Sequence, residues 1–176
     1  MEMQGSRRIA APRAVVWAAL NDPEVLKASI AGCQEITGTP EAGFEAVVKQ
    51  KVGPVSATFH GRVSFSDIVP LTSYTIAGEG KGGAAGFAKG SAAVALADEA
   101  GGTLLTYDVK ASVGGKLAQL GSRLIDGFAK KMADGFFDSF QAAVEPAREP
   151  EAAESGAAAE GERKPGWFRR LIRREA

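Results

Sequence analysis

The feature that most constrains the fold is a long helical pattern at residues 117–144, which needs a broad apolar surface to pack against. Apolar side chains recur there every three or four positions, and a second apolar row runs beside the first. The first row is Leu117, Leu120, Leu124, Phe128, Met132, Phe136, Phe140 and Val144, and the second is Ile125, Ala129, Ala133 and Phe137. Two adjacent rows make a face wide enough to cover a sheet. The charged side chains expected on the outer face are Lys130, Lys131, Asp134 and Asp138.

Five strand-like segments joined by turns precede this helix. In residues 55–66 apolar and polar side chains alternate, which is typical of a strand with one buried face. The turns contain Gly or Pro, as at Gly53-Pro54 and Gly101-Gly102. The expected strands are 44–48, 55–66, 74–80, 94–96 and 105–113. Upstream of them we expect a short strand at 3–9, a helix after Ala11-Pro12 and a second helix near 22–29.

Successive strands joined by short turns pair as antiparallel neighbours. We therefore expect an α+β fold of the helix-grip type, in which a curved antiparallel sheet wraps around the long C-terminal helix. The positions expected to face that helix are repeatedly small: Ala46, Ala57, Gly61, Gly78, Gly80 and Ala111. Such residues leave an internal space for a ligand, or they only allow the sheet to coil and bend, and the pattern alone favours neither interpretation.

The formal charge of the chain is zero at pH 7, but three segments contribute to it unequally. Residues 1–144 hold 14 Lys or Arg and 14 Asp or Glu, and this neutral domain argues against a nucleic-acid surface, which needs a basic face. Residues 145–164 are rich in Pro, Glu, Ala and Gly and contain no aromatic residue, so we expect a disordered acidic linker. Residues 165–176 follow as a basic tail.

The tail has the composition of a helix that lies in a membrane interface. Pro165-Gly166 marks a boundary, and a helix that begins near Trp167 would separate apolar residues from arginines. The apolar side consists of Trp167, Phe168, Leu171 and Ile172, and the basic side of Arg169, Arg170, Arg173 and Arg174. Trp at headgroup level and Arg on anionic lipid would hold the protein reversibly on a membrane surface. The alternative docking sites for this tail are a groove on a partner protein and the protein's own domain.

The sequence contains no convincing catalytic or metal-binding constellation. With one His and one Cys, a metal site or a nucleophile–base pair would have to combine His60 with Cys33. His60 falls on the polar side of its expected strand, and Cys33 follows Ala31-Gly32 at an expected turn. We therefore expect a solvated histidine and a small apolar filler. The glycine-rich stretch 78–87 lacks the spacing of a phosphate-binding loop and is expected to form a flexible rim.

We expect neither a membrane-spanning helix nor a targeting signal. No run of about 18 apolar residues occurs, as a spanning helix would need. The first residues lack the apolar region of a signal peptide, and a single cysteine fits a reducing compartment.

Four stretches resemble, in the same order, the family of the carbon monoxide dehydrogenase G subunit. They are APRAVVWAALNDPEVLKASIAGC, KVGPVSATFHGRV, GEGKGGAAGFAKGSAAV and VGGKLAQLGSRLIDGFAKKMADGFFDSF. The resemblance covers about residues 1–144. One departure lies in Ile30-Ala31-Gly32-Cys33, where the family usually has Pro in place of Ala31.

The resemblance implies a START-like helix-grip fold, a cavity for a hydrophobic small molecule and no catalytic activity. It also implies an accessory of molybdenum hydroxylases such as molybdenum CO dehydrogenase, because the family is thought to attach that enzyme to the membrane or to couple it to respiratory quinone. The implied ligand is an isoprenoid quinone, menaquinone or ubiquinone, with no covalently bound cofactor. The implied location is cytoplasmic, peripheral on the inner face of the cell membrane.

Aromatic and apolar side chains on the helix and strands are the candidates for the ligand site. They are Phe59, Phe65, Tyr74, Phe87, Tyr107, Leu124, Phe128, Met132 and Phe136. Tyr74 and Tyr107 can donate a hydrogen bond to a quinone carbonyl. Two alternatives remain: a recruitment or maturation factor for the dehydrogenase that carries no lipid, and an enzyme that acts on a hydrophobic small molecule.

Overall fold

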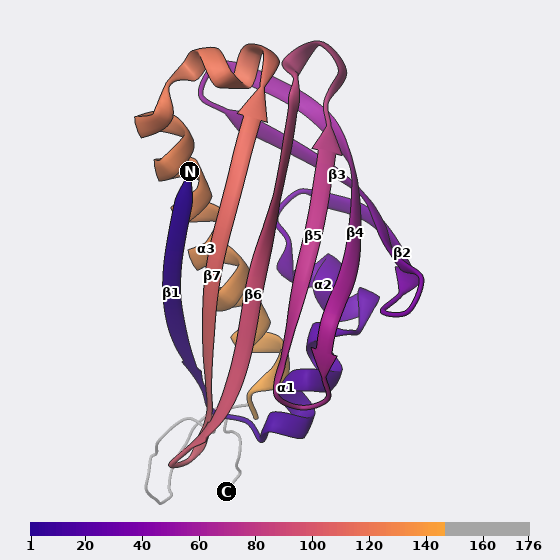
Figure 1. Ribbon diagram of the computed structural model, residues 1–176, viewed down its shortest axis with the longest axis vertical. Helices are drawn as coiled ribbons and strands as arrows, with labels where there is room; N and C mark the ends of the chain where they lie inside the picture. Colours follow the sequence, from indigo (N-terminus) through magenta and orange to yellow (C-terminus); the bar gives the residue numbers. More distant parts are fainter. Residues whose placement is uncertain (147–176) are drawn as a thin grey trace, which may run out of the picture. The chain divides into compact units, whose positions relative to one another are not determined.

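The computed structural model describes residues 1–146, and seven strands of this part form one antiparallel sheet. Their order is β1-β7-β6-β5-β4-β3-β2, so each strand from β2 to β6 pairs with the next one along the chain, and β1 pairs with β7. The strands are β1 (Glu2–Ile9), β2 (Cys33–Thr39), β3 (Gly43–Val52), β4 (Val55–Val69), β5 (Ser73–Lys81), β6 (Phe87–Glu99) and β7 (Gly102–Gly114). This arrangement confirms the expected α+β helix-grip fold (Figure 1).

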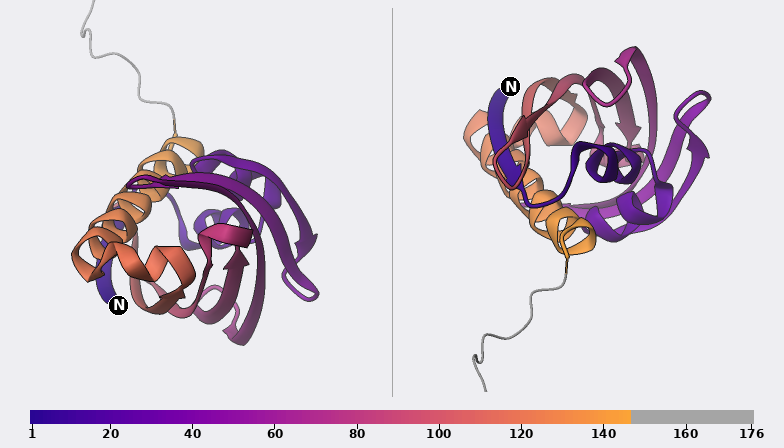
Figure 2. Two further views of the ribbon diagram at one scale, coloured as in Figure 1. Left: turned by 90° about the horizontal axis from the view of Figure 1, so that it is seen from above. Right: turned by 90° about the horizontal axis from the view of Figure 1, so that it is seen from below.

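Helices occupy the concave side of the sheet, which curves around them (Figure 2). The α-helices of the described part are α1 (Arg13–Leu20), α2 (Pro23–Ser29) and α3 (Ser122–Val144), and the 3₁₀ turns are η1 (Gly83–Ala85) and η2 (Gly115–Leu120). Asp22 starts α2, because its carboxylate accepts a hydrogen bond of 2.9 Å from the backbone N–H of Glu24. Pro23 occupies the first helical position, where its missing N–H is not needed.

The turns of the meander alternate between two ends of the sheet. The upper end in Figure 1 holds the β3–β4 turn, the β5–β6 loop with η1, and the β7–α3 connection with η2. The lower end holds α1 and the turns β4–β5 and β6–β7, and the β2–β3 turn lies at the right edge of the view. These two ends differ in packing and in charge.

The packed core lies toward the lower end. There the C-terminal half of α3 meets α1 and the ends of the strands, and the side chains of Phe140, Ile9 and Val16 have no exposed surface. The buried cluster is completed by Ala11, Ala19, Leu20, Tyr74, Leu96, Leu105 and Phe137. Thr103 is also buried, and its hydroxyl donates a hydrogen bond of 2.7 Å to the carbonyl of Ala11.

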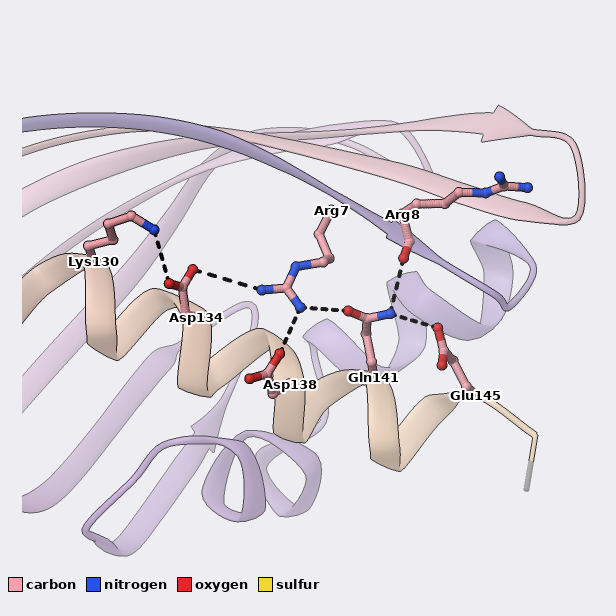
Figure 3. A network of polar contacts seen from close by, with 7 residues as sticks. All are labelled: Arg7, Arg8, Lys130, Asp134, Asp138, Gln141 and Glu145. Atoms are coloured by element: carbon pink, nitrogen blue, oxygen red, sulfur yellow. Dashed lines mark hydrogen bonds and ion pairs between the residues drawn. The ribbon is translucent and has the colours of Figure 1, made fainter. Parts of the chain in front are cut away.

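Polar contacts hold the same half of α3 against the edge strand β1 (Figure 3). The Arg7 guanidinium lies 2.9 Å from an Asp138 carboxylate oxygen and 3.9 Å from Asp134, and it donates a bond of 2.8 Å to the Gln141 side chain. It also lies over the Phe137 ring, 5.5 Å from the centroid. The Arg7 side chain is only 26% exposed, so these contacts are screened less than those of a surface ion pair.

Three sequence expectations need correction. Cys33 follows a turn at Ala31-Gly32, as expected, but it begins β2, an edge strand that the pattern does not predict, because Cys33–Thr39 lacks a clear alternation of apolar and polar side chains. The helical pattern is broken at Gly121, whose φ of +89° separates η2 from α3. Asp134 and Asp138 do not only face solvent, because they pair with Arg7.

The expected linker 145–164 and tail 165–176 lie outside the described residues, apart from Glu145 and Pro146. None of the helices between Met1 and Pro146 is long and apolar enough to cross a bilayer.

Two phenylalanines in the same row of α3 test the difference in packing. We expect Phe140→Ala to lower the free energy of unfolding by about 3–5 kcal/mol, since the ring is fully buried. Phe128→Ala should lower it by less than half as much, because the Phe128 side chain is only partly buried. Urea unfolding of both variants followed by circular dichroism measures the two losses. Equal losses would show that both halves of the helix are packed alike.

Candidate functional site

The concave face of the sheet carries small residues at the middle of its strands. The strand register places Ala46 opposite Gly61, and Gly61 opposite Gly80. In a neighbouring row, Gly78 lies opposite Gly90, and Gly90 opposite Ala111. Small residues therefore run across β3 to β7 on the side that faces the helices, and they form a shallow wall with few projecting side chains.

Two of these glycines border open space, and another does not. A Cβ built on Gly80 would meet only Phe59 Cβ, at 4.0 Å, and one on Gly61 would have its nearest atom at 3.7 Å, which are ordinary van der Waals contacts. A Cβ on Gly90 would overlap the carbonyl oxygen of Lys110. Position 90 needs a glycine because the backbone of β7 lies too close for a Cβ atom. Positions 61 and 80 have room for a side chain.

The N-terminal half of α3 forms the wall opposite these small residues. Within α3 only Phe137 and Phe140 are buried, and both belong to the C-terminal half. Phe128 and Met132 are partly buried, and Leu124 is 40% exposed. The inward-facing residues of β4 from Val55 to Phe65 are likewise only partly buried. We call this region, between the small-residue wall and the first half of α3, the open half.

The candidate ligand-site residues divide between the two halves. Tyr74 belongs to the buried cluster, and Phe65, Tyr107 and Phe136 pack against that cluster. Phe59, Phe87, Leu124, Phe128 and Met132 are the five that lie outside the buried cluster. The open half is therefore bordered by Phe59, Leu124, Phe128 and Met132, whereas Phe87 lies on the outer face of β6. The remaining four candidates belong to the core below the open half or pack against it. Whether any of them touches a ligand stays a prediction.

Aromatic rings pack against one another in and beside the buried cluster. The Phe65 ring centroid lies 5.1 Å from that of Tyr74 and 5.6 Å from that of Phe44. The Tyr107 ring stacks on Phe137 at 5.2 Å. Tyr107 also covers Gly5 of β1, because a Cβ on Gly5 would overlap its hydroxyl end. The small residue Gly5 thus makes room for a tyrosine, although no pattern in the sequence marks it.

Tyr74 is the most unusual polar group of this region. Its side chain is 6% exposed and lies against Trp17, with ring centroids 5.4 Å apart. Burial raises the pKa of the Tyr74 hydroxyl well above its ordinary value, so the group stays protonated and remains a donor. The hydrogen bonds found among residues 1–146 include none to this hydroxyl. A buried donor without a protein partner is suited to a carbonyl oxygen of a bound molecule.

The described residues offer apolar surface for binding a ligand. No group of three His, Cys, Asp or Glu side chains within residues 1–146 is arranged to hold a metal ion. His60 is exposed on the outer face of β4, and the Cys33 thiol donates a weak hydrogen bond of 3.5 Å to the Glu35 carbonyl. What remains is an apolar region, with one protonated tyrosine hydroxyl in the buried cluster below it.

Two hollows on the outer face of the sheet are different in character. One of about 680 Å³ is bordered by Arg62, Glu79, Lys89 and Lys110, and it is open to solvent. Charged side chains and small strand residues give it no apolar enclosure. We therefore place the candidate site on the concave face.

A protein family with the same sequence pattern matches nearly the whole described domain. It is the family of the carbon monoxide dehydrogenase G subunit (CoxG), and the match covers residues 5–145. A comparison with curated proteins gave no match.

Solved structures share the fold. A conserved protein from Geobacillus kaustophilus is 29% identical with a TM-score of 0.76, and the alignment covers 82% of this chain and 95% of that one. A protein from Rhizobium leguminosarum is 20% identical, with a TM-score of 0.63 and coverage of 82% and 93%. Protein CV1439 from Chromobacterium violaceum is 15% identical, with a TM-score of 0.62 and coverage of 84% and 99%. The last two likenesses concern the fold alone.

The hydroxyl of Tyr74 gives a testable dependence on pH. An unfolded chain ionises tyrosine near pH 10, whereas the folded state keeps this proton, so the wild type should lose stability as the pH rises above about 10. The loss approaches about 1.4 kcal/mol per pH unit. Tyr74→Phe lacks this contribution, so its stability relative to the wild type should increase over the same range. Urea unfolding of both proteins at a series of alkaline pH values measures the difference. A difference that stays constant with pH would contradict the burial of an ionisable hydroxyl.

Proposed function

Because the chain belongs to the CoxG family, we propose that it is a non-catalytic accessory protein that binds a hydrophobic molecule and couples a molybdenum CO dehydrogenase, or a related molybdenum hydroxylase, to the membrane. The ligand we propose is an isoprenoid respiratory quinone, menaquinone or ubiquinone. The protein would act at the cytoplasmic face of the cell membrane.

The observation that carries this proposal is the row of small residues on the concave face, opposite the less buried half of α3. A wall of small residues faces partly exposed apolar side chains of α3, whereas a protein that stabilised itself alone would bring larger side chains into contact there. Burying about 300 Å² of isoprenoid surface in this region would contribute roughly 7 kcal/mol before the loss of motional freedom. The Tyr74 hydroxyl would then donate to a quinone carbonyl.

The role we assign to the protein is shielding and presentation of the ligand. The quinone would leave the bilayer, occupy the open half with its isoprenoid chain covered, and meet the dehydrogenase from there. No step in this scheme requires a base, a nucleophile or a metal from this chain.

A leucine placed in the open half tests the ligand site. Gly80→Leu should fold, because a Cβ at Gly80 meets only ordinary contacts, and its side chain should occupy the space of the ligand. We expect at least a tenfold lower content of quinone in organic extracts of the purified variant, measured by mass spectrometry, because a filled site excludes the isoprenoid chain. Ala77→Leu is the matched control, since Ala77 is exposed on the opposite face of the same strand.

The outcomes separate the proposed carrier from a recruitment factor without a lipid. Wild-type protein from native membranes whose extracts repeatedly contain no quinone or other lipid would contradict ligand binding and favour the recruitment factor. Equal ligand content in Gly80→Leu and Ala77→Leu would place the ligand elsewhere.

The C-terminal tail gives a second test, on membrane attachment. The double variant Trp167→Ala, Phe168→Ala removes two aromatic side chains that the sequence places on the apolar side of the tail. We expect at least about tenfold weaker co-sedimentation with anionic vesicles, because each ring would bury apolar surface in the lipid interface. Unchanged binding would show that the tail is not the anchor.

A further inference from the structure

Three chain connections meet at the upper end and form a rim around the open half. The β3–β4 turn touches α3, because a Cβ on Gly53 would overlap the end of Leu124. The β5–β6 loop touches the β7–α3 connection, since a Cβ on Gly115 would overlap the Cα of Gly86. The backbone N–H of Gly82 closes the β5–β6 loop by donating to the Gly86 carbonyl at 2.8 Å. The rim is thus a continuous surface built from three segments of the chain.

Two large apolar side chains of this rim face solvent. Phe87 is 43% exposed and Leu124 is 40% exposed. Phe87 begins β6 on its outer face, and Leu124 lies in the first turn of α3, beside the open half. Exposed aromatic and aliphatic side chains at a rim are suited to insertion into a lipid interface.

The charges of the rim are mainly positive. Segments 49–56, 79–89 and 112–126 together hold six Lys or Arg and two acidic residues. The rim cations, by which we mean Lys51, Lys81, Lys116 and Arg123, are all exposed. Among the ion pairs within residues 1–146, only Lys81 of these four takes part, in a loose contact of 3.8 Å with Glu79.

The lower end has the opposite charge. The turn segments 65–73 and 96–104 hold three acidic residues and no Lys or Arg. The only neutralising contacts found there within the described chain come from neighbouring arginines, as between Arg13 and Asp98 at 2.8 Å. The neutral domain is therefore polarised along its strands, with the basic end at the open half.

We propose that the rim docks onto an anionic lipid surface, so that the open half faces the bilayer directly. The rim cations would meet lipid phosphates while Phe87 and Leu124 enter the interface. This inference rests on the proposed function, because it assigns the entry side of the proposed ligand site. It adds a membrane contact within the folded domain to the one expected from the tail.

A second exposed apolar patch could also contact lipid, and the charge around each patch distinguishes the two. Ile68, Val69 and Leu71 of the β4–β5 turn are 45%, 51% and 40% exposed. They lie at the acidic lower end, where anionic lipid would be repelled. The rim combines apolar exposure with positive charge, and the lower patch does not.

Chain length allows the tail and the rim to reach one membrane. The domain ends at the lower end, where the Glu145 carboxylate accepts a hydrogen bond of 2.8 Å from the Ala10 backbone. A strand of 13 residues spans about 43 Å. About 20 linker residues can extend to roughly 66 Å, which exceeds that distance.

The test compares two charge-reversal variants of the full chain. The rim variant is Lys51→Glu, Lys81→Glu, Lys116→Glu, and the control is Lys27→Glu, Lys110→Glu, Lys131→Glu, three exposed lysines away from the rim. Both change the net charge equally. Since each Lys near an anionic surface contributes about 1 kcal/mol, the rim variant should bind phosphatidylglycerol-containing vesicles at least about tenfold more weakly than the control. Equal affinity of the two variants would overturn the proposal.

The end of the domain that contacts the vesicle is identified by placing a polarity-sensitive dye on single cysteines in a Cys33→Ser background. A dye at Phe87→Cys should shift its emission to the blue on addition of the same vesicles, whereas a dye at Val69→Cys should not. A shift at Val69→Cys alone would overturn the proposed orientation. A rim variant that binds vesicles like the control but binds the dehydrogenase more weakly would make the rim a protein-docking surface, which also overturns it.

The ligand content of the same variants separates this inference from the proposed function. If wild-type extracts contain quinone and the rim variant binds vesicles like its control, only the docking surface is wrong. If wild-type extracts contain no lipid while the rim reversal weakens vesicle binding, the carrier function is wrong and the docking surface stands.

Discussion

The contact of α3 with the lower end of the sheet determines the rest of the structure. Phe137 and Phe140 pack into the cluster around Ile9 and Leu105, and Arg7 ties the flank of the same helix segment to β1. These contacts fix the helix at its C-terminal half. The N-terminal half lies across a part of the sheet where Ala46, Gly61 and Gly80 are small, and its apolar side chains are less buried. The C-terminal half of α3 thus stabilises the fold, and the N-terminal half borders the proposed ligand site.

The sequence predicted this fold more completely than it predicted the site. Alternation in β4 and the apolar rows of α3 reveal the buried faces, because each element exposes one side to water. The rows do not reveal that Phe140 is buried and Phe128 is not, because that difference depends on which residues face them across the sheet. The opposition of Gly61 and Gly80 depends on strand register, which the turns determine.

Other features could not be predicted from the sequence, and each has a physical reason. β2 is an edge strand whose side chains are mostly exposed, so no apolar period marks it. The pairing of Arg7 with Asp138 joins residues far apart in the chain, and periodicity only assigned the aspartate to the outside of a helix. The separation of basic and acidic turn residues between the two ends of the sheet also depends on topology. It becomes visible only when the fold shows which turns lie at the same end.

The central claim is that the open half is an apolar site for a guest molecule and not merely a loosely packed core. Nuclear magnetic resonance of the full-length protein with a labelled Met132 methyl group, titrated with a short-chain menaquinone analogue, examines that region itself. The account predicts intermolecular nuclear Overhauser effects from the analogue to Met132 and to the Phe128 ring, and none to Phe140. Contacts confined to the outer face of the sheet, or no contact at saturating analogue, would contradict it.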